Sequence, residues 1–502
     1  MKPDTAQKYS RYVDYMQKIA DIRSASAVLQ WDQETYLPPG GAMARGRQIA
    51  TLSELAHSHF SAPELGDLLT ELTEAEGLTA GQKKNIAINL DDYNRNRRYS
   101  SAFVRKLSEQ INQSFHAWLE ARKKNDFSVF KAELAGLIEL KKEESHIIGF
   151  SKHLYDAHLD EHDRGLTVEV TDRLFTDLKK ILSNVLPELI QQDDETSGVN
   201  FAMAKDDQWK LGMEILGLMG FSFDYGRQDI SEHPFTISFH PTDVRLTTRI
   251  NPDNFSGMLW SCIHEGGHGL YEQGLNPEEA GLPLGEACSL SIHESQSRLW
   301  ENCVGRSFAF CSFLLEKLKK HHPAQFGSVN AERFFRSVNQ VKPTLIRTES
   351  DEVTYHYHIL IRYEMEKDLL TGDLSVKDIP ARWNQLYKEY LGLDVPDDKQ
   401  GCLQDVHWSH GSFGYFPTYT LGSMYGIQFF DEYKSGNPQW EKEISAGEFG
   451  NIRNWLKSNV YNYGKFYNSL ELCNISTQHP LELGRFANYL ENKFKILTAS
   501  IL

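Results

Sequence analysis

The chain has 502 residues, 40% of them hydrophobic, so it is long enough to bury a large core. Its formal net charge of −16 at pH 7 argues against nucleic acid as a partner, because a polyanion binds to basic surfaces. The N-terminal segment is charged throughout, and no later stretch approaches the roughly 18 uninterrupted apolar residues of a membrane span. We therefore expect a cytoplasmic protein that binds neither nucleic acids nor membranes.

The first two hundred residues have helical periodicity. Apolar residues recur at helical spacing from Lys8 to about Leu29, and a Pro- and Gly-rich break at residues 37–41 precedes a second helical pattern at Arg45–His57. This start predicts a lid-like helical hairpin. Four further helical patterns follow, at Lys83–Arg98, Phe103–Lys124, Phe127–Ile148 and Val168–Gln192.

The pattern changes in the middle of the chain. Apolar and polar residues alternate in Phe235–His240 and again in Val244–Ile250, on either side of a Pro-Thr-Asp turn, which predicts a β-hairpin. Helical patterns return at Asn254–Gln273, Glu286–Lys320, Asp351–Leu370 and Val376–Leu393. The segment Gly401–Gly422 is rich in Gly, His and aromatic residues and predicts a loop that leads into another helix.

The helical segment after the hairpin contains a metal-binding pattern, His264-Glu265-Gly266-Gly267-His268. Four residues turn an α-helix by about 400°, so both imidazoles project from one face and are able to bind the same ion. Neutral imidazole suits zinc, and a glutamate beside the first histidine is able to take a proton from the water at the open coordination position. The pattern predicts a zinc site with Glu265 as the general base.

A catalytic zinc needs a third protein ligand. Glu294 follows His268 by 26 residues, which allows the first helix to end, turn, and be followed by a second helix that returns alongside it. From spacing alone, Glu286, His293 and Glu301 are alternatives on the same segment.

Six ordered motifs make the chain resemble the carboxypeptidase Taq family of metallocarboxypeptidases over most of its length. They are His233-Pro-Phe, Asp243-Val-Arg245-Leu-Thr247, the pattern at His264–His268, His293-Glu-Ser-Gln, Ile346-Arg347-Thr-Glu-Ser-Asp351, and Gly401-Cys-Leu-Gln-Asp405-Val-His407-Trp. Leu29-Gln-Trp-Asp-Gln-Glu-Thr35 and the break after it also resemble the N-terminal hairpin of that family. One departure is Ser350, where the family usually has alanine.

The resemblance implies a mainly α, two-lobed helical body with a deep substrate groove, the metal at its floor, and a small β-hairpin or sheet beside the metal-binding helix. It implies one peptidase domain over residues 1–502, with a mostly helical part at 1–230 and a catalytic part at 231–502. His264, His268 and Glu294 become the metal ligands, and Glu265 the catalytic base. The implied activity is release of single C-terminal amino acids from peptides with broad specificity, by a homodimer that uses Zn²⁺ or, as in some relatives, Co²⁺.

An enzyme that cuts at the C-terminus has to recognise a free carboxylate, and the planar guanidinium group pairs with a carboxylate through two hydrogen bonds. Arg347 and Arg245 are the candidates, and we favour Arg347. The alternative for each is a structural ion pair, with Asp351 for the first and Asp243 for the second. The strand that contains Arg245 is also able to line the groove and bind an extended peptide main chain.

The oxyanion of the tetrahedral intermediate needs a neutral hydrogen-bond donor, which we expect in the aromatic-rich segment after Gly401. We predict Tyr419 as that donor, with His407 as the second. His233, His410 and Tyr415 are assigned to substrate binding. Core packing is the alternative for each aromatic residue of the segment.

Two other functions are alternatives. The first is a helical zinc endopeptidase or dipeptidyl carboxypeptidase built on the same ligands, which differs in where the terminal carboxylate binds. The second is a non-catalytic binding protein with a structural zinc ion. Glu265 argues against the second, because zinc binding alone does not require a base at that position.

Overall fold

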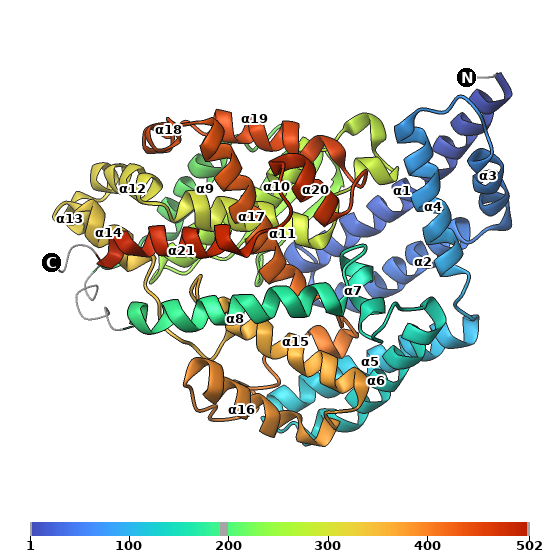
Figure 1. Ribbon diagram of the computed structural model, residues 1–502, viewed down its shortest axis with the longest axis horizontal. Coiled ribbons are helices and arrows are strands. Elements are labelled where there is room, and N and C mark those ends of the chain that lie inside the picture. Colours follow the sequence, from blue (N-terminus) through green and yellow to red (C-terminus); the bar gives the residue numbers. More distant parts are fainter. Residues whose placement is uncertain (1–2, 191–198, 499–502) are drawn as a thin grey trace. The chain divides into compact units, whose positions relative to one another are not determined.

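The computed structural model describes residues 3–190 and 199–498. Within them the chain forms 21 α-helices and one three-stranded sheet, so the predicted mainly helical class is confirmed (Figure 1). The chain divides into two compact units, each built from three separate segments. In the described residues, unit 1 comprises 3–97, 199–334 and 426–481, and unit 2 comprises 98–190, 335–425 and 482–498.

Unit 1 begins with the predicted helical hairpin. The helices α1 and α2 pack side by side, and the apolar face of α1 contributes Tyr12, Met16 and Ile19 to a core completed by leucines of α3 such as Leu65 and Leu69. The helices that begin in unit 1 are α1 (Pro3–Thr35), α2 (Ala42–Phe60), α3 (Pro63–Thr73), α4 (Ala80–Asn96), α9 (Lys205–Met219), α10 (Phe255–Gly274), α11 (Leu290–Arg298), α12 (Phe308–His321), α13 (Pro323–Phe326), α14 (Ala331–Val338), α18 (Trp440–Ala446), α19 (Gly450–Asn459) and α20 (Ser469–Thr477).

A small mixed sheet lies beside α10 in unit 1. The strands β2 (Thr236–His240) and β3 (Asp243–Thr248) form the predicted antiparallel hairpin, and both pack against α10. A third strand, β1 (Gly226–Ile230), pairs in parallel with β3. The order β1-β3-β2 makes β3 the central strand and β2 an edge strand among the described residues. The sequence pattern does not predict β1, because Gly-Arg-Gln-Asp-Ile lacks the alternation that marks a half-buried strand.

The helix α11 is shorter than the sequence pattern predicted. We expected one helix over Glu286–Lys320, whereas α11 ends at Arg298 and continues as a π-helical segment, η4 (Leu299–Gly305), before Ser307 caps the separate helix α12. Apolar periodicity extends through both helices and therefore did not reveal the interruption. Such π-helical turns are frequent at functional sites.

Unit 2 is helical in the residues described. The helices that begin in it are α5 (Ser101–Lys124), α6 (Ser128–Ile148), α7 (Asp156–His162), α8 (Val168–Ile190), α15 (Tyr355–Thr371), α16 (Ile379–Leu391), α17 (Phe416–Gly436) and α21 (Leu483–Thr498). The boundary between the units falls within α14 and α17. Residues 191 and 192, the end of one predicted helix, lie outside the described residues.

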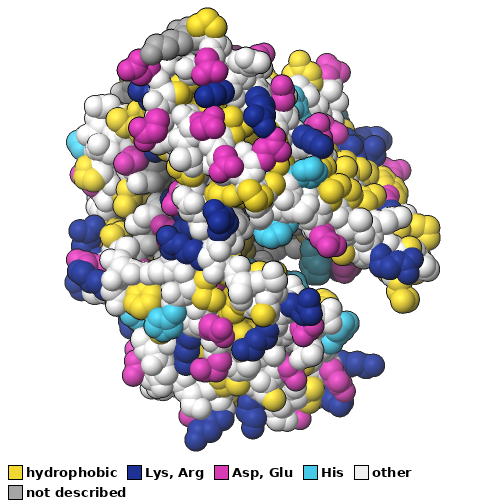
Figure 2. All heavy atoms as spheres, turned by 90° about the vertical axis from the view of Figure 1, so that its right-hand side faces the viewer, with side chains coloured by type: hydrophobic (Ala, Val, Ile, Leu, Met, Phe, Trp, Pro, Cys, Tyr) yellow, Lys and Arg dark blue, Asp and Glu magenta, His cyan; other side chains and the backbone are white. Residues whose placement is uncertain are grey.

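Charged side chains of both signs are interspersed with hydrophobic ones on the face shown in Figure 2. No helix in the described part of the chain combines the length and the apolar character that a membrane crossing requires.

Candidate metal centre and associated residues

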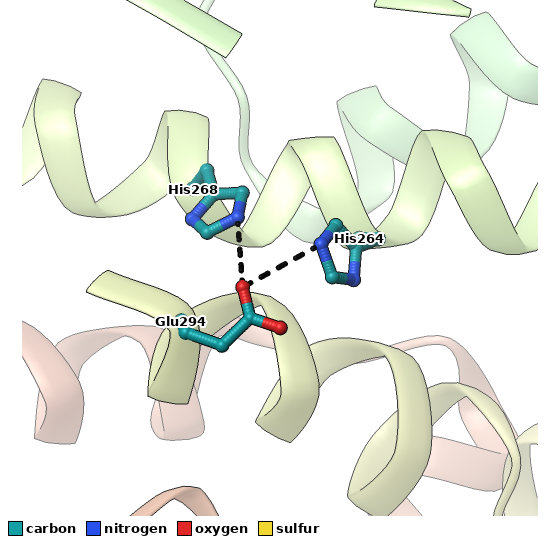
Figure 3. Close-up of side chains that lie close together, drawn as sticks. All are labelled: His264, His268 and Glu294. Carbon is teal, nitrogen blue, oxygen red and sulfur yellow. Dashed lines mark ion pairs between the residues drawn. The ribbon is translucent and has the colours of Figure 1, made fainter. Parts of the chain in front are cut away.

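Two neighbouring helices of unit 1 bring the three predicted metal ligands together. His264 and His268 project from the same face of α10, and Glu294 faces them from α11 (Figure 3). Glu294 Oε2 lies 3.8 Å from Nε2 of His264 and 3.5 Å from Nε2 of His268. One ligand atom from each residue lies within 4.8 Å of the other two.

The donor set fits a divalent metal ion. Two imidazole nitrogens and one carboxylate oxygen are ligands that zinc prefers. Bonds of about 2.0–2.2 Å in a tetrahedral arrangement place neighbouring ligand atoms about 3.4 Å apart, close to the separations of 3.5 and 3.8 Å between Glu294 and the two histidines. Three protein ligands also leave one tetrahedral position for a water molecule.

Glycine 267 permits the close packing of α10 and α11. A Cβ at this position would lie 2.6 Å from the backbone oxygen of Gln296 and 2.8 Å from Cα of Ser297. Ser289 caps α11 by accepting a hydrogen bond from the Ile292 N–H, which fixes the start of the helix at Leu290, four residues before Glu294. Gly267 therefore has a structural cause, because any side chain at this position would push α11 away from α10.

Charges around the site favour an ionised Glu294. Its Oε1 accepts a hydrogen bond of 2.7 Å from Nε of Arg298, which leaves Oε2 facing the imidazoles. Burial opposes the charged form of Glu294, but Arg298 and the two histidines hold its pKa well below its usual range. Burial likewise disfavours a charged His264, but Glu294 and Glu301 raise its pKa to about 8. Burial lowers the pKa of His268 to about 4, which keeps this imidazole neutral.

The predicted base, Glu265, is a buried residue of α10 that contacts the edge strand. Thr236 of β2 donates a hydrogen bond of 2.6 Å to its Oε2. Burial raises the pKa of the Glu265 carboxyl. The sheet therefore orients the side chain that follows the first histidine, a contact that the sequence spacing did not reveal.

The alternative ligands of α11 and η4 have other partners. Glu301 accepts a hydrogen bond of 2.8 Å at Oε2 from Nδ1 of His264, and Arg306 donates to its other oxygen. Nδ1 of His293 lies 2.6 Å from Nδ1 of His268, and Glu286 forms an ion pair with Lys465. Of the acidic candidates, Glu294 alone directs an oxygen at both metal-binding nitrogens in the described residues.

In unit 2, Arg347 belongs to a buried charge cluster. Its guanidinium group bonds to Oδ1 of Asp405 at 3.0 and 2.9 Å, and its NH1 donates to the Tyr355 hydroxyl. Arg362 bonds to the other oxygen, Oδ2, at 2.7 and 2.5 Å. Burial disfavours the Asp405 carboxylate, but the two guanidinium groups hold its pKa far below its usual range. The expected structural partner of Arg347 was Asp351, which instead accepts backbone hydrogen bonds at the start of α15.

Three of the predicted aromatic residues cluster at Tyr419, whose ring lies over Arg347. The ring of Tyr419 lies 5.1 Å from the guanidinium carbon of Arg347, and the rings of His407 and Tyr415 lie 6.3 and 5.3 Å from that of Tyr419. Burial lowers the pKa of His407 to about 3, so its imidazole is neutral at pH 7. His410 is exposed and packs on Phe115 of α5.

Glu366, a buried residue of α15, holds the segment that carries these aromatic residues. Its carboxyl group accepts hydrogen bonds from the Trp408 indole at 2.8 Å, from the Gly414 backbone at 2.9 Å, and from Tyr155. Burial raises the pKa of Glu366 to about 7. The sequence pattern does not predict this role for Glu366, because a glutamate within an amphipathic helix is ordinarily exposed.

The two remaining candidates lie in unit 1. Arg245 of β3 bonds to both oxygens of Asp243 and lies 4.3 Å from the ring of Trp31 on α1, so its alternative as part of a structural ion pair has direct support. The expectation that its strand binds a peptide main chain is wrong, because β3 is already hydrogen-bonded to a strand on each side. His233 is exposed in the connection between β1 and β2.

Comparisons with known proteins agree over nearly the whole chain. The sequence model of the family described as carboxypeptidase Taq (M32) metallopeptidase matches residues 11–494. Carboxypeptidase 1 of Bacillus subtilis is 35% identical, over 97% of this chain and 98% of that protein, and thermostable carboxypeptidase 1 of Thermus thermophilus is 35% identical over 99% and 100%. The crystal structure of an M32 carboxypeptidase from Deinococcus radiodurans superimposes with a TM-score of 0.95 at 34% identity, covering 98% of this chain and 99% of that one.

Proposed function

The chain belongs to the carboxypeptidase Taq (M32) family of metallopeptidases and is a metallocarboxypeptidase, and we propose that it releases single C-terminal amino acids with a metal ion held by His264, His268 and Glu294. The observation that carries this assignment is the convergence of one Glu294 oxygen and two imidazole nitrogens. Zinc is the proposed ion, with cobalt as a functional substitute. We further propose that the enzyme is a cytoplasmic homodimer that acts as one peptidase domain.

Glu265 is the proposed general base. The bound metal ion would supply Lewis acidity and lower the pKa of a water molecule. Glu265 accepts the proton of that water as it attacks the scissile carbonyl, and later delivers the proton to the leaving amine. The hydrogen bond from Thr236 supports this role, since it holds one carboxylate oxygen and so restricts the rotation of the other. The buried surroundings also favour proton uptake by Glu265.

Arg347 is the proposed group for recognition of the terminal carboxylate. Two guanidinium groups, of Arg347 and Arg362, share the single carboxylate of Asp405, so the three side chains together carry an excess positive charge that an anion is able to neutralise. The Tyr355 hydroxyl and the Asp405 carboxylate fix the orientation of Arg347 before substrate binds. Such preorganisation reduces the entropy lost on binding.

The remaining assignments concern the substrate's other atoms. Tyr419 is the proposed donor to the oxyanion, with His407 as the second. The His407 imidazole is neutral at pH 7 and therefore does not add to the charge of the Arg347 cluster. Tyr415 and His410 are proposed to contact substrate side chains, and Arg245 and His233 to shape the substrate-binding surface. The peptide main chain would pair with β2, since β2 is an edge strand and contacts Glu265 through Thr236.

Two measurements test the proposal. Incubation of the zinc-loaded protein with a peptide blocked at its N-terminus, followed by mass spectrometry, should show a ladder of products shortened by one C-terminal residue at a time. Products shortened by two residues, or internal fragments, would indicate a dipeptidyl carboxypeptidase or an endopeptidase instead. The variant Glu265→Gln should bind zinc like the wild type but lose turnover, because an amide accepts no proton. Normal turnover by the zinc-loaded variant would contradict the role of Glu265.

A further inference from the structure

A row of polar side chains lies behind the metal ligand His268. Its second ring nitrogen, Nδ1, points away from Glu294 (Figure 3) and lies 2.6 Å from Nδ1 of His293. The other nitrogen of His293, Nε2, lies 2.8 Å from Oε1 of Glu272. The side chains of His293 and Glu272 are only 21% and 16% exposed, so these hydrogen bonds are shielded from water.

Metal binding fixes the direction of both hydrogen bonds. When Nε2 of His268 donates its lone pair to an ion, the neutral ring carries its hydrogen on Nδ1. That N–H has to donate to Nδ1 of His293, which then accepts and carries its own hydrogen on Nε2. The Nε2–H of His293 in turn donates to Oε1 of Glu272. Each donor in the row therefore meets an acceptor in this one arrangement.

We propose that His293 and Glu272 are positioning residues, which fix the tautomer and the ring orientation of His268 so that its Nε2 faces the metal ion. This inference rests on the proposed metal site and extends it by two side chains that do not touch the ion. Histidine ligands generally donate their second N–H to a carboxylate or carbonyl group, and such partners strengthen metal binding.

The two histidine ligands are supported in different ways. Nδ1 of His264 meets the carboxylate of Glu301 directly at 2.8 Å, and Arg306 bonds to the other oxygen of that carboxylate. Nδ1 of His268 does not meet a carboxylate directly, because the ring of His293 lies between it and the carboxylate of Glu272. The helix spacing explains this placement, because Glu272 follows His268 by one turn of α10, whereas His293 reaches across from α11.

The geometry separates this role from two others. His293 is not a ligand through Nδ1, because two nitrogens bound to one zinc ion lie about 3.3 Å apart, and 2.6 Å leaves no room for an ion between them. If His293 were merely a packed histidine of α11, its removal would change the stability of the fold and leave the affinity of the folded protein for metal unaltered.

The test measures the affinity of the full-length, metal-free protein for Zn²⁺ by competition with a chromophoric chelator, at one fixed pH. His293→Phe keeps a ring but accepts no hydrogen bond, and Glu272→Leu leaves the Nε2–H of His293 unpaired. Each should weaken zinc binding about 10- to 100-fold. His293→Asn places an acceptor near the position of Nδ1, and Glu272→Gln retains an acceptor oxygen, so both should bind zinc more tightly than the first two variants.

A matched control is His158→Phe, which removes a fully buried, hydrogen-bonded histidine of unit 2 and should leave zinc affinity unchanged. Thermal unfolding of each metal-free variant shows whether it is folded. If His293→Phe does not fold, Glu272→Leu decides, because the hydrogen bonds connect Glu272 to His268 through His293. Wild-type affinity in a folded His293→Phe or Glu272→Leu variant, or equal losses in His293→Phe and His293→Asn, would overturn the proposal. A wild-type chain that does not bind zinc would instead refute the metal site itself.

Discussion

Replacing Gly267 by alanine should weaken metal binding without touching a ligand. The added Cβ would lie 2.6 Å from the backbone oxygen of Gln296, which is 0.8 Å inside the 3.4 Å where ordinary van der Waals contact begins. Because the obstructing atoms belong to the backbone of α11, no side-chain rotation relieves the overlap, and the helix has to move. Overpacking of this kind destabilises a protein by about 1–3 kcal/mol. The higher helix propensity of alanine offsets roughly 1 kcal/mol of that loss.

The displacement matters because Glu294 is only two residues before Gln296. Metal–ligand distances tolerate changes of about 0.2 Å, several times less than the required movement. We expect Gly267→Ala to lower zinc affinity about tenfold or more, which corresponds to about 1.4 kcal/mol or more. The assay is a competition titration of the metal-free protein with Zn²⁺ and a chelator.

Gly266→Ala is the matched control, because it makes the same change one residue earlier in the same helix. Its Cβ would approach the ends of the Leu216 and Met219 side chains of α9, at 2.6 and 3.1 Å, and such flexible groups are able to shift. Zinc affinity of this variant should therefore stay near that of the wild type. Wild-type affinity in Gly267→Ala, or equal losses in both variants, would show that the spacing between α10 and α11 does not determine the position of Glu294.

Three further outcomes are expected. Arg347→Ala should lower kcat/KM about 100-fold or more for a peptide with a free C-terminal carboxylate. It should change kcat/KM little for the amidated peptide, which has no carboxylate to pair with Arg347. Equal losses for both peptides would show that Arg347 stabilises the fold and does not bind the substrate. Burial raises the pKa of Glu366 to about 7 in the folded protein. Between about pH 4.5 and 7 the folded state therefore keeps a proton that the unfolded state has lost. The free energy of unfolding should fall as the pH rises through this window. Denaturant titrations should show Glu366→Gln gaining about 3 kcal/mol relative to the wild type across that window, and a difference independent of pH would contradict the shift. A chelator should abolish peptide hydrolysis, and Zn²⁺ or Co²⁺ should restore it; activity that survives metal removal would rule out the proposed mechanism.

The sequence alone determined the features that depend on local periodicity. The helical patterns, the hairpin at residues 235–250 and the common face of His264 and His268 all follow from spacings of a few residues along one element. The family resemblance added Glu294, because ordered motifs carry information about distant residues that spacing does not. In retrospect, Glu272 was also within reach, since it continues the four-residue spacing of the two histidines.

Only the tertiary structure decided which side chains meet across elements. Asp405 rather than Asp351 pairs with Arg347, although Asp351 is closer in sequence, because the segment before α17 folds back onto Arg347. The strand β1 forms because it pairs with β3, and no pattern within the five residues of β1 predicts this pairing. The contact of Gly267 with α11 likewise depends on helix packing. Such contacts arise from the close-packed fitting of surfaces far apart in the chain, whereas a sequence pattern records only the face that each element presents.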